Sequence, residues 1–233
     1  DKTIASIVEE SIEDISSLVE QIVTRMKVGG RLFYIGAGTS GRLGVLDAAE
    51  CPPTYGVDKG LVVGIMAGGD NAMFTAQEGA EDSLELAAKD LAYYNLSEKD
   101  SVIGLAASGR TPYVLGGLRY ARQVGALTGT ISCVKNAEIS EAADYPIEAV
   151  TGAEAIMGST RMKAGTAQKL ILNMISTSVM IKLGKVYKNY MVDVKPTNKK
   201  LVVRSKNMIR TLTGVDEERA EQLYEASGHN VKK

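Results

Sequence analysis

The chain has 233 residues, of which 45% are hydrophobic and 5% aromatic, and its 27 basic and 28 acidic residues leave a net charge of -1. This length suits one α/β domain with extra helices. The balanced charge excludes a protein that attracts nucleic acid or an anionic membrane by bulk charge, so an anionic ligand must be held by local geometry.

Cys51 and Cys133 are the only cysteines, and they have no metal-like spacing. With no disulfide framework, no signal peptide and no apolar run long enough to span a bilayer, the sequence predicts a cytoplasmic protein. Because the chain starts at Asp1 rather than Met, we expect both ends to lack residues.

The first predicted element is an amphipathic helix over residues 3–28, which Gly29-Gly30 ends. Short apolar runs then predict five strands, at residues 31–35, 61–66, 101–106, 127–132 and 145–150. Helices are predicted between them, at 41–50, 84–94 and 112–124. This alternation indicates a mostly parallel sheet with helices on both faces, which binds ligands beyond the carboxyl ends of its strands.

The pattern changes after residue 150. A long helix within residues 158–184 is apolar on more than one side, which indicates a buried helix, often one between subunits. Two more helices are predicted, at 196–212 and at 216–227, with Asp216 as the N-cap of the second and Gly228 after its end. We therefore expect a sheet domain over residues 1–195 and a helical segment over 196–233.

Two loops between a strand and a helix carry glycines and hydroxyls: Gly36-Ala-Gly-Thr-Ser-Gly-Arg42 and Ala107-Ser-Gly-Arg-Thr-Pro112. Glycines bring backbone N–H groups close to a ligand, and a helix N-terminus adds partial positive charge. The loops together could hold one phosphate. Its predicted contacts are Gly38, Thr39, Ser40, Ser108, Gly109 and Thr111.

Two other interpretations of these loops stay open. Serine and threonine commonly cap helices where no ligand binds. Gly36-x-Gly38-x-x-Gly41 also matches a dinucleotide-binding fingerprint, which expects an acid about 20 residues later. Asp70 comes later than that, and the hydroxyls and the second loop favour a sugar monophosphate.

Glu50 is predicted to end the helix over 41–50, directly before Cys51-Pro52-Pro53. A position before proline and at a helix C-terminus is unusual for an acid and could raise its pKa, which suits a proton donor. Ten helical residues span about 15 Å, which separates Glu50 from a phosphate at Ser40. A second subunit that completes the site, or a sugar that reaches back along the loop, would resolve this separation.

A second acidic cluster is Glu78-Gly-Ala-Glu-Asp-Ser83, with Glu81 in an irregular stretch and Asp82 or Ser83 as a helix cap. Its alternative interpretation is a solvated helix start. His229 is the only histidine, so we expect carboxylates to carry any acid–base chemistry, with no metal and no cofactor. Cys51 has no obvious activating base and is predicted to be structural.

The last cluster is Gly158-Ser-Thr-Arg-Met-Lys-Ala-Gly-Thr-Ala-Gln-Lys169. Ser159 or Thr160 suits the cap of the long helix. Arg161 and Lys163 could contact an anion or a neighbouring subunit, or could form only surface ion pairs.

These segments together resemble the N-acetylmuramic acid 6-phosphate etherase family over nearly the whole chain. The resemblance is carried by Gly36–Gly44, Asp47-Ala-Ala-Glu-Cys-Pro-Pro-Thr-Tyr55, Glu78–Ser83, Ala107–Tyr113, Gly158–Lys169 and Asn189–Asn198. It implies an α/β SIS-domain fold, with a parallel sheet of about five strands flanked by helices and additional C-terminal helices. It also implies a homodimer whose sites lie near the subunit interface.

The resemblance further implies a carbon–oxygen lyase that converts N-acetylmuramic acid 6-phosphate to N-acetylglucosamine 6-phosphate and D-lactate in cell-wall sugar recycling. On the family pattern, Glu81 is the base that removes the C2 proton of the open-chain aldehyde, and Glu50 is the acid that protonates the departing lactate oxygen at C3. Elimination is followed by addition of water.

The glucokinase regulatory protein shares this fold and parts of the first motif, so a regulatory protein that senses a sugar phosphate is the alternative function. Two positioned carboxylates favour the enzyme, because a regulator does not need them. Etherases continue beyond both ends of this chain, so the segment over 196–233 looks incomplete.

Overall fold

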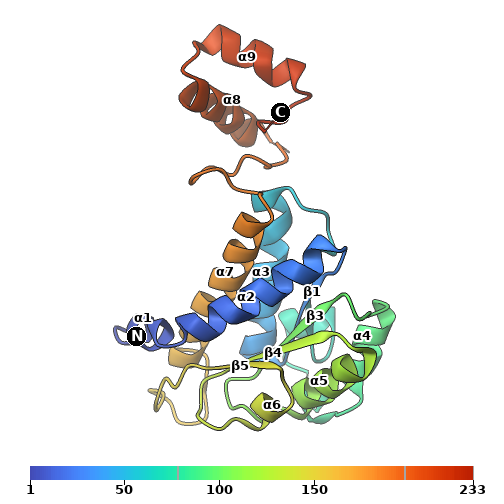
Figure 1. Ribbon diagram of the computed structural model, residues 1–233. Helices are drawn as coiled ribbons and strands as arrows, with labels where there is room; N and C mark the ends of the chain where they lie inside the picture. Colours follow the sequence, from blue (N-terminus) through green and yellow to red (C-terminus); the bar gives the residue numbers. More distant parts are fainter. Residues whose placement is uncertain (78, 197, 233) are drawn as a thin grey trace. The chain divides into compact units, whose positions relative to one another are not determined.

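The computed structural model describes residues 1–77, 79–196 and 198–232 (Figure 1). The chain divides into two compact units. The first consists of Asp1–Ala49 and Gly60–Val179, and the second of Glu50–Lys59 and Met180–Lys233. The division near residue 180 comes earlier than the expected boundary at residue 195, and a short piece from the first half of the chain belongs to the second unit.

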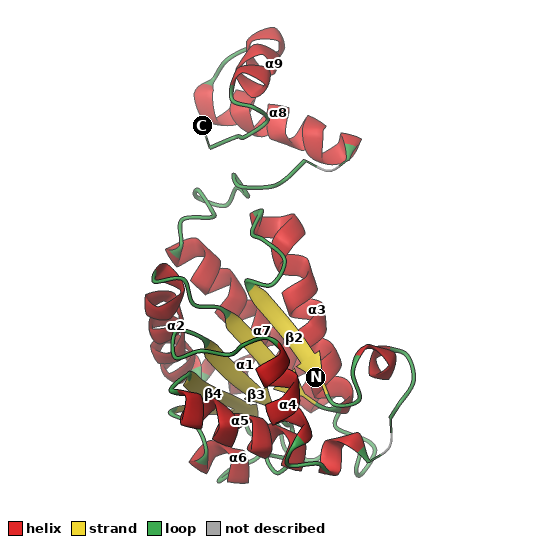
Figure 2. Ribbon diagram, turned by 90° about the vertical axis from the view of Figure 1, so that its right-hand side faces the viewer, coloured by secondary structure: helices red, strands yellow, loops and turns green. Residues whose placement is uncertain are grey.

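The first unit is built on a five-stranded sheet of order β2-β1-β3-β4-β5 (Figure 2). All four pairings are parallel, which confirms the predicted sheet. The strands are β1 (Leu32–Gly36), β2 (Val62–Met66), β3 (Ser101–Leu105), β4 (Leu127–Ser132) and β5 (Tyr145–Glu148). The chain places β2 on one side of β1 and β3 on the other, and ligands of such sheets bind at this switch point.

Helices cover both faces of the sheet, which explains why the inner strands β1, β3 and β4 are buried along their whole length. Phe33 and Ile35 of β1 lie in the apolar cluster with α4 (Leu86–Tyr93) and α5 (Pro112–Val124). Successive side chains of a strand alternate between faces. Tyr34 accordingly points to the opposite face, which α2 (Ile12–Lys27), α3 (Gly38–Tyr55) and α7 (Lys163–Lys182) cover (Figure 1). Short elements complete the unit: 3-10 turns at Asp70–Met73 and Ala80–Asp82, and α6 (Glu138–Glu141).

The N-terminal helix predicted over residues 3–28 is two helices, α1 (Ile4–Glu9) and α2. The chain breaks at Glu10–Ser11, and each helix buries its own apolar side chains, such as Val8 in α1 and Ile15 in α2. Ile12, the first residue of α2, is 49% exposed although it is apolar. The single-helix prediction was wrong because the helix is interrupted at Glu10 and Ser11, although the Ser11 side chain makes no capping hydrogen bond.

Helix α3 is longer than the 41–50 predicted, because it begins at Gly38 and runs to Tyr55 through Pro52 and Pro53. A proline cannot donate the helical bond to the residue four positions earlier, and this led the sequence reasoning to end the helix at residue 50. The chain stays helical beyond both prolines, and the Gly56 N–H donates to the Pro52 carbonyl at 3.0 Å.

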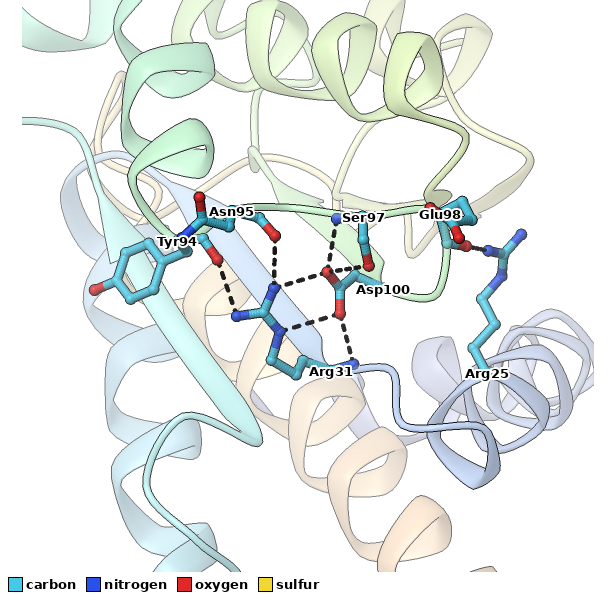
Figure 3. Close-up of polar contacts among 7 residues, drawn as sticks. All are labelled: Arg25, Arg31, Tyr94, Asn95, Ser97, Glu98 and Asp100. Carbon is cyan, nitrogen blue, oxygen red and sulfur yellow. Dashed lines mark hydrogen bonds and ion pairs between the residues drawn. The ribbon is translucent and has the colours of Figure 1, made fainter.

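A partly buried ion pair ties β1 and β3 together at their amino ends (Figure 3). The Arg31 guanidinium contacts the Asp100 carboxylate at 2.9 Å and also donates to the carbonyls of Tyr94 and Asn95. Asp100 accepts further bonds from Ser97, and nearby the Arg25 side chain donates to the Glu98 carbonyl. Burial alone would raise the pKa of Asp100, but the bonds from Arg31 and Ser97 outweigh it and lower that pKa.

The second unit contains α8 (Lys199–Thr213) and α9 (Glu217–Ala226), which start and end within three residues of the predicted limits. The Asp216 side chain accepts a bond from the Arg219 N–H, so the predicted N-cap is confirmed. Ile209, Ala220 and Tyr224 form a small apolar core between the two helices. In the described parts of the chain, no helix has both the length and the apolar character that crossing a membrane requires.

Candidate active site

The two glycine–hydroxyl loops leave the sheet side by side. Strands β1 and β3 are hydrogen-bonded neighbours with Gly36 opposite Leu105, and each loop follows directly after these residues. Gly38 and Gly109 have φ values of +53° and +71°, in the left-handed region that glycine favours. At Gly109 a Cβ would also lie 2.5 Å from the Cβ of Ala137. The predicted juxtaposition of the loops at the carboxyl edge of the sheet is therefore present.

The first loop turns into α3 without a linker, so Gly38, Thr39 and Ser40 form the first turn of the helix. At Gly41 a Cβ would approach the Gly36 carbonyl oxygen to 2.7 Å, so a side chain there would push the turn away from the sheet. The N–H groups of a first helical turn have no partner within the helix, which suits them to an anion.

The hydroxyls of the two loops have different surroundings. Ser40 is 7% exposed, and its Oγ donates to Oε1 of Gln168 on α7 at 2.8 Å. Thr39 is half-buried and Ser108 is exposed. Thr111 occupies the N-cap position of α5, but its side chain makes no capping hydrogen bond. The simple helix-cap interpretation therefore does not explain Thr111.

Glu81 and Gly38 line the same cavity, of about 220 Å³, beyond the carboxyl ends of β1 and β2. Glu81 is exposed and belongs to the 3-10 turn Ala80–Asp82. Ser83 accepts a bond from the Leu86 N–H at 3.2 Å, so of the two predicted caps it is Ser83 that bonds the start of α4. Glu78 lies outside the described residues.

Arg42 lines this cavity too, and the sequence reasoning did not single it out. Its guanidinium donates to the carbonyls of Ala72 at 2.7 Å and Met73 at 3.0 Å. It thereby ties the start of α3 to the segment that leads to Glu81. Its position as the last residue of the Gly36–Arg42 loop was the signal that could have identified it.

Glu50 is exposed and lies inside α3, five residues before the helix ends at Tyr55. The expectation that it sits at a helix C-terminus, out of helical conformation, was therefore wrong. It is ten residues beyond Ser40 on the same helix, which corresponds to about 15 Å of helical rise. Glu50 falls within the second compact unit and Glu81 within the first.

Asp47, one turn before Glu50 and the first residue of the Asp47–Tyr55 motif, is a buried acid. Its Oδ1 accepts from Nδ2 of Asn173 at 2.8 Å and from Oγ of Ser176 at 3.0 Å, both on α7. Burial raises the pKa of Asp47 in spite of these hydrogen bonds. The cluster joins α3 to α7. The sequence signal that could have identified Asp47 was an acid among apolar helix positions.

Helix α7 begins at Lys163, and the side chain that caps its N-terminus comes from outside the helix. The Glu154 carboxylate accepts from the N–H groups of Lys163 at 3.0 Å and Ala164 at 3.1 Å, so the predicted caps Ser159 and Thr160 were wrong. These backbone bonds outweigh the effect of burial and lower the pKa of Glu154. Lys163 donates to the Ala153 carbonyl at 2.8 Å and is thus engaged within its own loop.

Both cysteines are buried. Burial, together with the nearby charge of Glu154, raises the pKa of the Cys133 thiol to about 12. A thiol of this kind is unreactive at neutral pH. Cys51 is 1% exposed, in keeping with the structural role that the sequence indicated.

A parallel sheet of this order, with two glycine–hydroxyl loops at its switch point, is the fold of an SIS-domain protein. Residues 14–122 match the glucokinase regulatory protein N-terminal SIS domain. A solved phosphoheptose isomerase from Francisella tularensis shares the fold with a TM-score of 0.56 at 17% identity, over 77% of this chain and 97% of that one.

Full-length relatives are far more similar. An N-acetylmuramic acid 6-phosphate etherase from Clostridium botulinum is 64% identical over 100% of this chain and 77% of its own length. Another from Bacillus cereus is 60% identical over 100% of this chain and 79% of its own. The chain therefore belongs to the N-acetylmuramic acid 6-phosphate etherase family, as its motifs indicated, and is an enzyme rather than a regulatory SIS protein.

Proposed function

We propose that this protein cleaves the lactyl ether of N-acetylmuramic acid 6-phosphate and releases N-acetylglucosamine 6-phosphate and D-lactate. The observation that carries the proposal is the cavity in which Glu81 lies beside Gly38 of the glycine-rich loop. It puts a carboxylate next to a candidate phosphate cradle, in a chain 64% identical to an etherase.

The phosphate of the substrate would be held by the two loops. The first turns of α3 and α5 supply backbone N–H groups, and Gly38 and Gly109 allow the chain to turn tightly there. Thr39, Ser108 and Thr111 supply hydroxyls, and Ser40, whose own hydroxyl donates to Gln168, supplies its backbone N–H. The proposal explains how a chain with a net charge of -1 binds an anion, because the positive potential is local.

The first chemical step is removal of the C2 proton of the open-chain aldehyde by Glu81. The adjacent C1 carbonyl takes up the electron pair as an enolate, so the aldehyde itself serves as the electron sink. The enolate then expels the C3 oxygen as Glu50 protonates it, which breaks the ether bond and frees D-lactate. Water adds to C3 of the resulting unsaturated aldehyde, and a proton returns to C2.

Two carboxyl groups are sufficient for this sequence of steps, with one ionised and one protonated at the start. No step as written calls for a redox change. We accordingly propose that the enzyme needs neither metal nor cofactor.

We also propose that the protein is a cytoplasmic homodimer that serves peptidoglycan recycling, with its sites near the subunit interface. Exposed apolar side chains support a protein partner: Met157 is 99% exposed, Ile156 58% and Met162 41%, all in the segment before and at the start of α7. Sedimentation equilibrium of the purified chain would test the dimer.

The function is tested by incubating the protein with N-acetylmuramic acid 6-phosphate in the presence of a chelator and assaying D-lactate. We expect lactate and N-acetylglucosamine 6-phosphate in equal amounts. No lactate above the buffer control would refute the proposed activity, and lactate only without chelator would refute the cofactor-free mechanism.

A further inference from the structure

The hydroxyl of Ser40 is already engaged within the fold. A serine hydroxyl has one proton, and Ser40 donates it to Oε1 of Gln168 at 2.8 Å. Both residues are buried, with Ser40 7% and Gln168 1% exposed. A hydrogen bond between two such side chains is shielded from water and fixes both rotamers.

The amide of Gln168 is held at its other end as well. Its Nε2 donates to the carbonyl oxygen of Ile131, near the end of β4, at 3.5 Å. A flipped amide would set its oxygen against the Ile131 carbonyl oxygen, so this long contact favours the orientation that accepts from Ser40. Two hydrogen bonds thus connect the carboxyl end of β4, through α7, to the first turn of α3.

The backbone of α7 also lies against this turn. A Cβ on Gly165, three residues before Gln168, would sit 3.6 Å from Cγ2 of Thr39. Helix α7 therefore packs against Thr39 and hydrogen-bonds Ser40. The Glu154 carboxylate bonds the N–H groups of Lys163 and Ala164 and so holds the start of α7 in place.

We propose that Gln168 is a positioning residue of the phosphate-binding loop. Its amide fixes Ser40, and with it the first turn of α3 whose N–H groups face the phosphate. The inference rests on the proposed function of this loop and adds a residue that lies 128 positions away in the sequence. Neither Gln168 nor Ser40 lines the cavity that contains Glu81, so we expect Gln168 to affect binding through the loop and not proton transfer.

The test uses Gln168→Met, which keeps the length of the side chain and removes its hydrogen bonds. We expect KM for N-acetylmuramic acid 6-phosphate to rise about 5- to 30-fold, the effect typical of losing one buried hydrogen bond, with kcat within about threefold of wild type. The dissociation constant of N-acetylglucosamine 6-phosphate, measured by calorimetry, should rise by the same factor. In a Ser40→Ala background the same substitution should have little further effect, because the bond is already absent.

Thr128→Val is the matched control. Thr128 is a fully buried polar residue of β4, the strand that also contains Ile131. Its Oγ1 bonds Asp144 near the amino end of the strand, away from the phosphate loops. This variant should lose stability and keep the wild-type KM. If Gln168→Met does not fold, Gln168→Asn retains an amide that is too short to bridge Ile131 and Ser40, and it should show the same rise in KM.

Three results would overturn the proposal: an unchanged KM, a fall in kcat at constant KM, or effects of the Gln168 and Ser40 substitutions that multiply independently. Failure of the proposed function is distinct, because wild type would then release no D-lactate. The calorimetric comparison with N-acetylglucosamine 6-phosphate would still test Gln168 in that case, since it requires no turnover.

Discussion

Glu81 and Glu50 have different proposed tasks, so their amide variants should fail at different steps. Glu81→Gln removes the base, and exchange of the C2 proton with solvent should be abolished together with lactate release. Glu50→Gln removes the acid, and some C2 exchange should persist while lactate release is lost. Proton NMR in D2O follows the exchange, and an enzymatic lactate assay follows cleavage. Full lactate release by either variant would contradict the assignment of that residue.

Ser108 is exposed in the second loop, so its hydroxyl is available to a ligand without rearrangement of the core. Ser108→Ala should weaken binding of N-acetylglucosamine 6-phosphate by about 1–2 kcal/mol, the order of magnitude of one hydrogen bond. Calorimetry measures the affinity, and Ser159→Ala is a control because Ser159 lies outside both loops. An unchanged dissociation constant would remove Ser108 from the phosphate site.

The surroundings of individual side chains were the feature of the structure that the sequence predicted least well. The residue types at Ser40, Ser108 and Glu81 indicated a phosphate site and a carboxylate base. That Ser40 donates to Gln168, and that Asp47 accepts from Asn173 and Ser176, depends on partners on α7. No local pattern specifies which distant helix lies opposite a given side chain.

Helix α7 depends at its start on an acid that lies outside it. Glu154→Ala removes the acceptor for the N–H groups of Lys163 and Ala164, and loss of such a cap typically costs about 1 kcal/mol. We expect faster hydrogen exchange confined to the first turn of α7, measured by mass spectrometry or NMR. Thr160→Ala, at a position that resembled a cap in the sequence, should leave this exchange unchanged. Equal effects of the two substitutions would contradict the role of Glu154.

The helices show where local sequence signals predict the start and end of a helix correctly and where they do not. Helix α5 has the predicted limits, Pro112–Val124, because a proline at its first position and Gly125 after its end are strong local signals. Helix α3 passes through Pro52 and Pro53, which local rules treat as a stop. The N-terminal pattern concealed a break at Ser11 because the apolar spacing continues across it.

The stability of the whole sheet unit should depend on pH through Asp100. The folded-state pKa of Asp100 is lowered, so its contribution to stability is present above the pKa of about 3.9 of an unfolded aspartate and is lost as pH falls through the folded-state value. Asp100→Asn should cost roughly 1.5–3 kcal/mol of unfolding free energy at neutral pH and weaken the loss of stability below about pH 4.

Urea unfolding at several pH values measures this effect. Glu85→Gln is the control, because the Glu85–Lys89 pair is exposed and 3.8 Å apart, and such pairs contribute little. A pH profile that is the same for wild type and Asp100→Asn would show that Asp100 is not responsible for the acid sensitivity.

The parallel α/β fold, the two glycine–hydroxyl loops and the family follow from the amino-acid sequence, because apolar runs, glycines and long motifs act through neighbouring residues. The order β2-β1-β3-β4-β5, the cavity that Glu81 and Gly38 share, and the bond between Ser40 and Gln168 required the folded chain. These features join residues that are tens to more than a hundred positions apart. The packing of the sheet and its helices brings them together, and short-range patterns do not specify that packing.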